Sequence, residues 1–127
     1  MLIAVGAPLT RRFLRLTGQK STNPPASPGG HVDPGETSLA AAAREVGEET
    51  GVHVTADSLR PIGVWDAPGR DPRGRYVTVA YAAVVPAGTQ IVAGDDARRA
   101  RWWPLDNLPS LAFDHADIVR AATARTR

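Results

Sequence analysis

Residues 30–52, which read GHVDPGETSLAAAAREVGEETGV, decide the fold. From Thr37 onwards, apolar residues recur at the spacing i, i+3, i+4 and i+7, which is the period of one helix face. The positions are Leu39, Ala42, Ala43 and Val46. Thr37 is suited to cap the start of a helix, and Gly51 stands where a left-handed residue commonly ends one. The stretch therefore predicts an amphipathic helix between Thr37 and Gly51.

The neighbouring face of the same helix is acidic. Glu45, Glu48 and Glu49 fall within an arc of roughly 100° on a helical wheel. Like charges at this spacing destabilise a helix unless a cation neutralises them, and hard divalent cations prefer carboxylate oxygens. Arg44 is placed to bridge to a carboxylate such as Glu36 or Glu49 and to hold the acidic side chains in place. Solvated glutamates on an exposed helix are the alternative interpretation.

The flanking residues favour the metal interpretation. Residues 30–52 match the Nudix box pattern G-x5-E-x7-R-E-U-x-E-E-x-G-U, where U is aliphatic, at every defined position. The chain thus resembles the Nudix hydrolase family. The resemblance implies an α/β (α+β) fold in which a mixed β-sheet lies between helices, and we expect residues 1–127 to form a single domain of this kind.

The resemblance also implies roles for individual residues. Glu45, Glu48 and Glu49 are the expected ligands of Mg²⁺, with Mn²⁺ as an alternative, and the Gly29 carbonyl is a further candidate ligand. Arg44 is expected to orient these carboxylates, and Glu48, Glu49 and Arg44 are the candidate catalytic residues. The reaction of the family is attack by water on a phosphorus of a nucleoside diphosphate that is linked to another moiety.

The general base stays open at this point. The family draws it either from the glutamates of the box or from an acidic residue on a later loop. Asp95 and Asp96 follow Gly94, and Asp96 is the candidate on such a loop. A simple turn is the competing interpretation of this Gly-Asp-Asp sequence.

A second motif points to the substrate. Residues 69–74, GRDPRG, resemble a segment of the ADP-ribose pyrophosphatase-like group, and residues 94–97, 103–109 and 111–115 resemble the corresponding end of those proteins. Arg70, Arg73 and Arg75 are therefore candidate contacts for phosphate or ribose, because a guanidinium donates forked hydrogen bonds. Arginines of a polar loop are also commonly solvated, which is the alternative.

The remaining elements are read from local composition. Residues 52–55, 61–65, 76–85 and 99–105 are predicted strands because they are rich in β-branched and aromatic residues. A last helix is predicted from Asp114, with Ile118, Val119 and Ala122 facing the core. Trp65, Trp102, Trp103 and His115 are assigned structural roles, with stacking on a base as the alternative for the tryptophans. Residues 1–28 contain two short apolar runs and a proline-rich stretch, and we interpret them as an atypical or shortened N-terminal region.

Composition limits the chemistry further. Hydrophobic residues make up 43% and charged residues 22%, as in ordinary globular proteins. The chain has no cysteine, which excludes a disulfide and a thiolate metal site within it. No apolar run reaches the roughly 20 residues that a transmembrane helix needs. We expect a cytoplasmic protein that binds a small nucleotide, without nucleic-acid or membrane partners, and the resemblance leaves a homodimer open.

Three functions are compatible with these features. The leading hypothesis is metal-dependent hydrolysis of ADP-ribose or a related nucleotide sugar to AMP and a sugar phosphate. The second is pyrophosphohydrolysis of modified nucleoside triphosphates, because the box does not choose the leaving group. The third is a non-catalytic domain that binds an ADP-ribose-like ligand.

Overall fold

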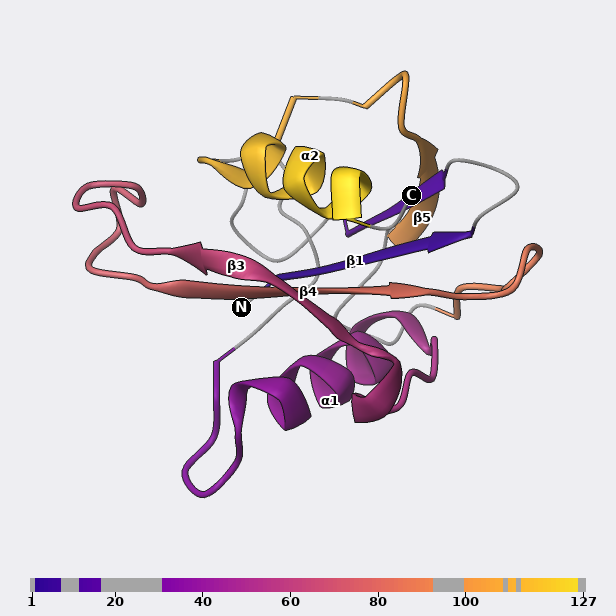
Figure 1. Cartoon of the computed structure of the whole chain (residues 1–127), viewed down its shortest axis with the longest axis horizontal. Coiled ribbons are helices and arrows are strands. Elements are labelled where there is room, and N and C mark those ends of the chain that lie inside the picture. The colour runs from indigo at the N-terminus through magenta and orange to yellow at the C-terminus, as the bar shows by residue number, and fades with distance from the viewer. Residues whose placement is uncertain are drawn as a thin grey trace.

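A mixed β-sheet forms the centre of the fold (Figure 1). The structure, a computed structural model, describes residues 2–7, 12–16, 31–92, 100–108, 110, 111 and 113–125. Within these residues the strands are β1 (Leu2–Ala7), β2 (Arg12–Leu16), β3 (Arg60–Trp65), β4 (Thr78–Val84) and β5 (Ala100–Pro104). Their order across the sheet is β3-β4-β1-β2-β5. β1 and β4 pair in parallel and the other neighbours are antiparallel, so the sheet is mixed, as predicted.

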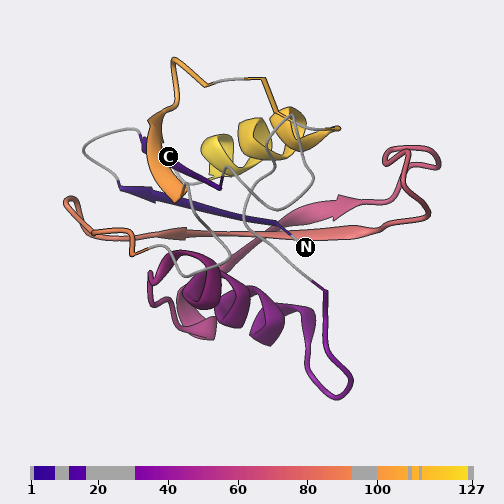
Figure 2. The same ribbon diagram turned by 180° about the vertical axis from the view of Figure 1, so that it is seen from behind.

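Two helices cover opposite faces of the sheet. Helix α1 (Ser38–Thr50) lies below the sheet in Figure 1 and helix α2 (His115–Arg125) lies above it, and the reverse view in Figure 2 shows the same layers. A short 3-10 helix, η1 (Ala56–Ser58), connects α1 to β3. This arrangement confirms the α+β fold with a mixed sheet between helices.

Strand β4 contributes to a hydrophobic core on each face of the sheet. Tyr81 and Ala83 pack with residues of α1, whereas Ala80 and Ala82 pack with residues of α2. Successive side chains of a strand point to opposite faces, so a strand covered on both sides is apolar throughout. The uninterrupted apolar run in residues 79–83 therefore follows from burial on both faces.

The predicted helical stripes face the core, with Leu39 and Ala43 of α1 partly buried and the other members buried. Val46 of α1 has 0% exposure, and Ile118, Val119 and Ala122 of α2 are 1–2% exposed. Burial of one such aliphatic side chain stabilises the folded state by about 1.5–3 kcal/mol. These side chains hold each helix at a defined position over the sheet.

One predicted strand is wrong. Residues 52–55 form no strand but a connection that leads into η1. Val52 is nevertheless buried, at 2% exposure, and its backbone N–H donates to the hydroxyl of Thr50. Burial explains the apolar character of this segment without a strand pairing, so β-propensity was misleading here.

The other strand predictions need smaller corrections. The predicted strand at residues 76–85 shortens to Thr78–Val84, and the one at residues 99–105 ends at Pro104, with Leu105 in the following turn. The apolar runs at the N-terminus form β1 and β2, and β1 continues through Gly6 to Ala7. No helix in the described part of the chain has the length and apolar character needed to cross a membrane.

Candidate metal and nucleotide site

Helix α1 begins and ends where local sequence signals place it. Thr37 has an extended backbone, and its hydroxyl accepts from the Ala40 N–H at 3.1 Å. At the other end Gly51 has a φ of 68°, and its N–H donates to the Gly47 carbonyl. Both predicted helix ends are therefore confirmed, and Glu45, Glu48 and Glu49 lie on this one helix.

The loop before α1 is folded back by Glu36. Its N–H donates to the Asp33 carbonyl at 3.1 Å, and its carboxylate accepts from the Asp33 N–H at 2.7 Å. The His31 carbonyl accepts from Arg44 at 3.1 Å, and the Asp33 carboxylate lies 3.3 Å from the same guanidinium. Arg44 thus ties the loop to the middle of the helix.

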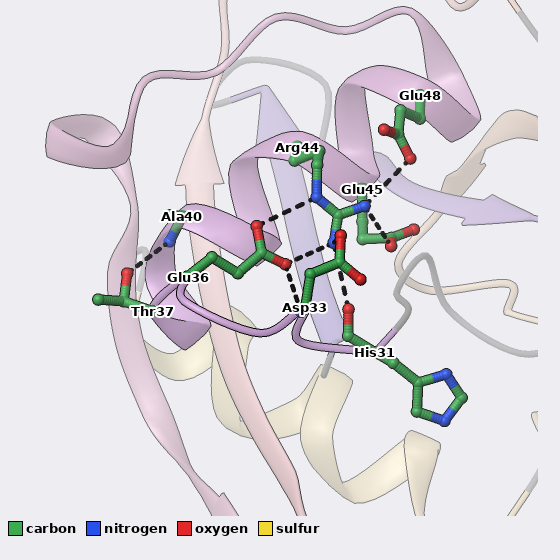
Figure 3. Close-up of polar contacts among 8 residues, drawn as sticks. All are labelled: His31, Asp33, Glu36, Thr37, Ala40, Arg44, Glu45 and Glu48. Atoms are coloured by element: carbon green, nitrogen blue, oxygen red, sulfur yellow. Dashed lines mark hydrogen bonds and ion pairs between the residues drawn. The ribbon is translucent and has the colours of Figure 1, made fainter.

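Arg44 is the centre of the site. Its Nε and Nη2 donate to the two oxygens of Glu36 at 3.1 and 2.6 Å, which confirms the predicted bridge. Its Nη1 donates to Glu45 at 2.7 Å and to Glu48 at 3.2 Å. Figure 3 shows these side chains converging on the guanidinium. The bidentate geometry orients Glu36 and Arg44 together, which a single point charge would not do.

These contacts shift the pKa values of Glu36 and Arg44. The hydrogen bonds from Arg44, together with the Asp33 N–H, hold the pKa of Glu36 below its ordinary value. Hydrogen bonds to Glu36 and Glu45 raise the pKa of Arg44 above its ordinary value. Both groups are therefore charged over the whole physiological pH range.

The site carries more negative than positive charge. Four carboxylates, those of Asp33, Glu36, Glu45 and Glu48, contact the single guanidinium of Arg44. All four side chains offer carboxylate oxygens, the type of ligand atom that Mg²⁺ and Mn²⁺ prefer. The chemistry of this donor set fits a hard divalent cation.

The carboxylates are not gathered into a ready-made coordination shell. Among the described residues, no three acidic or histidine side chains cluster closely enough to hold a metal ion. Glu45 and Glu48 instead point to Arg44, and the Glu48 side chain is 60% exposed. Gly29, Asp95 and Asp96 lie outside the described residues, so their assigned roles stay predictions.

A second polar cluster joins the β3–β4 loop to the segment directly before α2. The guanidinium of Arg70 donates to both oxygens of Asp114 at 2.7 and 2.6 Å. Arg73 makes a similar pair with Asp71, at 3.0 and 2.7 Å. The hydrogen bonds that the Arg73 side chain and backbone N–H donate hold the pKa of Asp71 below its ordinary value.

Sequence reasoning missed the partners in this cluster. The sequence predicts that the last helix begins at Asp114, and the Asp114 carbonyl does accept from the Ile118 N–H, but its carboxylate binds Arg70. No local pattern links two residues that are 44 positions apart. Asp71 and Arg73 are two positions apart, so alternating charge in the loop was the signal that could have revealed their pairing.

The third candidate arginine and the tryptophans occupy different surroundings. Arg75 is exposed, and its Nη1 donates to the Ala67 carbonyl at 3.4 Å.

Trp102 packs against the core on the α1 side and donates from Nε1 to the Thr89 carbonyl, and Trp65 packs against the core on the α2 side. The structural interpretation of these two tryptophans is therefore confirmed.

The two clusters are connected through aromatic side chains. The rings of His31 and Tyr76 lie 6.2 Å apart, and the Arg73 guanidinium lies 5.6 Å from the Tyr76 ring. The backbone of His31 is itself bound to Arg44. The arginine loop and the carboxylate cluster therefore belong to neighbouring parts of one surface.

Comparisons with known proteins point to one family. A model of the NUDIX domain matches residues 2–122. The chain is 45% identical over 95 residues to the ADP-ribose pyrophosphatase of Methanocaldococcus jannaschii, which is 75% of this chain and 54% of that protein. The chain thus spans about half the length of that relative.

Solved structures share the fold. A MutT/nudix family protein from Enterococcus faecalis has a TM-score of 0.86 at 25% identity, over 98% of this chain and 60% of that one. The NUDIX domain of Shewanella oneidensis NrtR, solved with ADP ribose, has a TM-score of 0.80 at 24% identity, over 100% of this chain and 89% of that one. With the family match over nearly its whole length, this chain belongs to the NUDIX family.

Proposed function

We propose that this protein is a metal-dependent hydrolase of nucleoside diphosphates linked to another moiety, with ADP-ribose as the preferred substrate. The observation that carries the proposal is the Arg44 cluster, in which one guanidinium orients four carboxylates on and before a single helix. Support for the substrate comes from the 45% identical archaeal protein, which is an ADP-ribose pyrophosphatase.

In this proposal Glu45, Glu48 and Glu49 hold Mg²⁺ or Mn²⁺, together with the Gly29 carbonyl. Such an ion neutralises the diphosphate and lowers the pKa of a bound water. Arg44 and Glu36 keep the carboxylates oriented, as outer partners of a metal site do. Water attacks one phosphorus, the bridging P–O bond breaks, and the products are AMP and ribose 5-phosphate. Asp96 is the proposed base on the later loop.

The proposed substrate contacts come from the arginine loop. The side chains of Arg73 and Arg75 are exposed, and Arg73 lies against Tyr76, whose ring in turn neighbours that of His31. An arginine can bind a phosphate through two parallel hydrogen bonds, so these side chains suit the second phosphate or the ribose of the substrate. A homodimer and a cytoplasmic location stay predictions.

A ligand-binding role without catalysis is the second candidate. It is favoured by the NUDIX domain of Shewanella oneidensis NrtR, which was solved in complex with ADP ribose. The complete set of box glutamates in this chain favours catalysis instead, because binding alone does not require Glu45, Glu48 and Glu49 together. The two roles differ in whether bound ADP-ribose is cleaved.

The test is product analysis with ADP-ribose, NADH and nucleoside triphosphates, in Mg²⁺ or Mn²⁺. The wild type is compared with Glu49→Gln and with Asp57→Asn, a control that removes an exposed acidic charge from η1. We expect AMP and ribose 5-phosphate from ADP-ribose. Loss of a metal ligand should lower kcat by at least about 100-fold, which is about 2.7 kcal/mol in the barrier.

Each alternative has its own outcome. Release of pyrophosphate from triphosphates, with no turnover of ADP-ribose, supports the triphosphate hydrolase. Tight binding of ADP-ribose without any product supports the non-catalytic domain. Equal activity of Glu49→Gln and Asp57→Asn contradicts the proposed metal site.

A further inference from the structure

The three arginines of the β3–β4 loop are not equivalent. The Arg70 side chain is 5% exposed, whereas that of Arg73 is 54% exposed. Arg70 uses Nε and Nη2 for Asp114, and its Nη1 donates to the Thr78 hydroxyl at 2.8 Å. A ligand could reach this guanidinium only if these bonds were broken. Arg70 is therefore built into the fold.

Arg73 is held differently. Its Nε and Nη2 bind the Asp71 carboxylate, which is 4% exposed. The guanidinium carbon lies 4.9 Å from the Phe113 ring and 5.6 Å from the Tyr76 ring. Its Nη1 has no protein hydrogen bond within the described part of the chain. The guanidinium is thus oriented by an acid and two rings while one donor group remains available.

The two ion pairs are interleaved in the sequence. Asp71, which binds Arg73, directly follows Arg70, and Phe113, which lies against Arg73, directly precedes Asp114. The bond between Arg70 and Asp114 therefore joins the two segments that contact Arg73. Without it, the loop and the segment before α2 would have one less connection.

Phe113 shows why this connection matters. Its φ is 52°, the left-handed region that residues with a bulky side chain rarely occupy. Such a conformation costs on the order of 1–2 kcal/mol and persists only where neighbouring contacts enforce it. The bidentate bond at the adjacent Asp114 is a contact of this kind. It fixes the backbone from which the Phe113 ring reaches Arg73.

The position of Arg73 relative to the box suggests what it binds. Tyr76 neighbours both the Arg73 guanidinium and the His31 ring, and the His31 carbonyl accepts from Arg44. These contacts link Arg73 to the loop of the carboxylate cluster, where the proposed function places the diphosphate of a nucleotide. The available donor of a guanidinium is suited to an anionic phosphate oxygen.

We propose that the Arg70–Asp114 pair is a positioning element for Arg73, and that Arg73 binds a phosphate oxygen of the substrate through its free Nη1. This inference rests on the proposed function, because it takes a nucleotide diphosphate as the ligand. In this inference Arg73 contacts the substrate, and Arg70 acts only by positioning Arg73.

The experiment measures affinity and turnover separately in four variants. These are Arg70→Lys, Arg73→Ala, the double variant and Arg120→Ala, a control that removes an exposed arginine of α2. Affinity for ADP-ribose is measured by calorimetry with the metal present and cleavage suppressed by Glu49→Gln in every variant. kcat and KM are measured without that substitution, and thermal unfolding reports whether each variant folds.

We expect Arg73→Ala to weaken binding about tenfold and to raise KM with little change in kcat, because one charged hydrogen bond is lost. Lysine cannot reproduce the bidentate bond to Asp114, so Arg70→Lys should also weaken binding. The double variant should bind no more weakly than Arg73→Ala alone, since both changes act through one contact. Arg120→Ala should bind as the wild type does.

Three results would overturn the inference. The first is a double variant whose loss of ADP-ribose affinity equals the product of the losses in the two single variants. The second is wild-type affinity for ADP-ribose in Arg73→Ala. The third is an Arg70→Lys variant with a lower melting temperature but unchanged affinity for ADP-ribose. Asp114→Asn provides the same comparison if Arg70→Lys fails to fold. A protein that binds no nucleotide contradicts this inference as well, whereas coupled binding without cleavage contradicts only the proposed catalysis.

Discussion

The guanidinium of Arg44 donates to both carboxylate oxygens of Glu36, which stands eight residues earlier, at 3.1 and 2.6 Å. The same group reaches forward to Glu45 and Glu48 on its own helix. Arg44 therefore links the loop before α1 to the acidic face of α1. Because the contact with Glu36 is bidentate, it determines the direction in which the remaining Nη1 points.

The first prediction concerns Glu36. Glu36→Gln keeps the size of the side chain but removes the charge and replaces one acceptor by a donor. The guanidinium of Arg44 should then shift towards Glu45 and Glu48 and compete with a metal ion for them. We expect a fall in kcat/KM for ADP-ribose of about 10–100-fold, the usual range when an outer partner of a metal site is lost.

Asp33→Asn is the matched comparison. Asp33 also contacts Arg44, at 3.3 Å, but its side chain is 64% exposed and its ion pair is screened by water. Its effect should be much smaller than that of Glu36→Gln. Equal activities of the two variants would show that the bidentate contact does not organise the site.

The second prediction concerns metal binding. Four carboxylates share one guanidinium, so this cluster in the folded protein has an excess of negative charge that a divalent cation would neutralise. Mg²⁺ should therefore raise the melting temperature of the wild type. The stabilisation should reach about 2.7 kcal/mol when the free ion is at 100 times its Kd.

The control for this measurement is KCl at matched ionic strength, together with the variant Glu48→Gln. KCl should not reproduce the shift, and Glu48→Gln should need a higher Mg²⁺ concentration for the same shift. An unchanged melting temperature of the wild type in Mg²⁺ would count against a metal site at this helix.

Local sequence signals predicted the part of the site that depends on neighbours in the chain. The hydroxyl of Thr37 and the left-handed Gly51 end the helix through contacts within four residues. The Arg44–Glu36 bridge joins a helix to the loop directly before it, so the spacing in the box was sufficient to predict it.

Contacts between distant segments could not be predicted in this way. The sequence predicts Arg70 as a substrate contact because residues 69–74 resemble a segment of the ADP-ribose pyrophosphatase-like group and a guanidinium donates forked hydrogen bonds. Its partner Asp114 is 44 residues away and becomes a neighbour only when α2 packs on the sheet. The strand prediction for residues 52–55 failed for a similar reason, because Val52 and Val54 are apolar through their packing in the core on the α1 side rather than through strand pairing.

The third prediction uses two glycines of the box. Gly51 has a φ of 68°, and a Cβ at this position would lie 2.8 Å from the Val92 carbonyl oxygen. Gly51→Ala therefore combines a strained backbone with a clash, and it should destabilise the protein by more than about 1 kcal/mol. Chemical denaturation of the variant measures this loss.

Gly47→Ala is the opposite case. Gly47 lies inside α1, and the nearest atom to an added Cβ is 4.0 Å away, which is ordinary contact. Alanine in a helix interior is favoured over glycine by about 0.5–1 kcal/mol. The two variants should thus change the free energy of unfolding in opposite directions, and a loss of stability in Gly47→Ala would contradict the described geometry of the helix.

The fourth prediction concerns pH. The pKa of His115 is lowered from 6.5 to about 4, mainly by burial; the charge of Asp114 opposes this shift, and those of Arg70 and Arg73 contribute to it. In the unfolded chain this histidine binds a proton near pH 6.5, whereas in the folded protein it stays neutral to about pH 4. Between these values the unfolded state binds more protons, so the stability falls as the pH is lowered.

The measurement is the free energy of unfolding between pH 7 and pH 5. This range lies above the ordinary pKa of glutamate and aspartate, and the pKa values of Glu36 and Asp71 are lowered, so these two carboxylates stay ionised throughout it. His115→Gln should flatten the dependence on pH, because glutamine does not titrate. His53→Gln, which changes an exposed histidine, should keep the wild-type slope. If His115→Gln retains that slope, some other group is responsible, and the neutral state of His115 does not contribute to the pH dependence of folding.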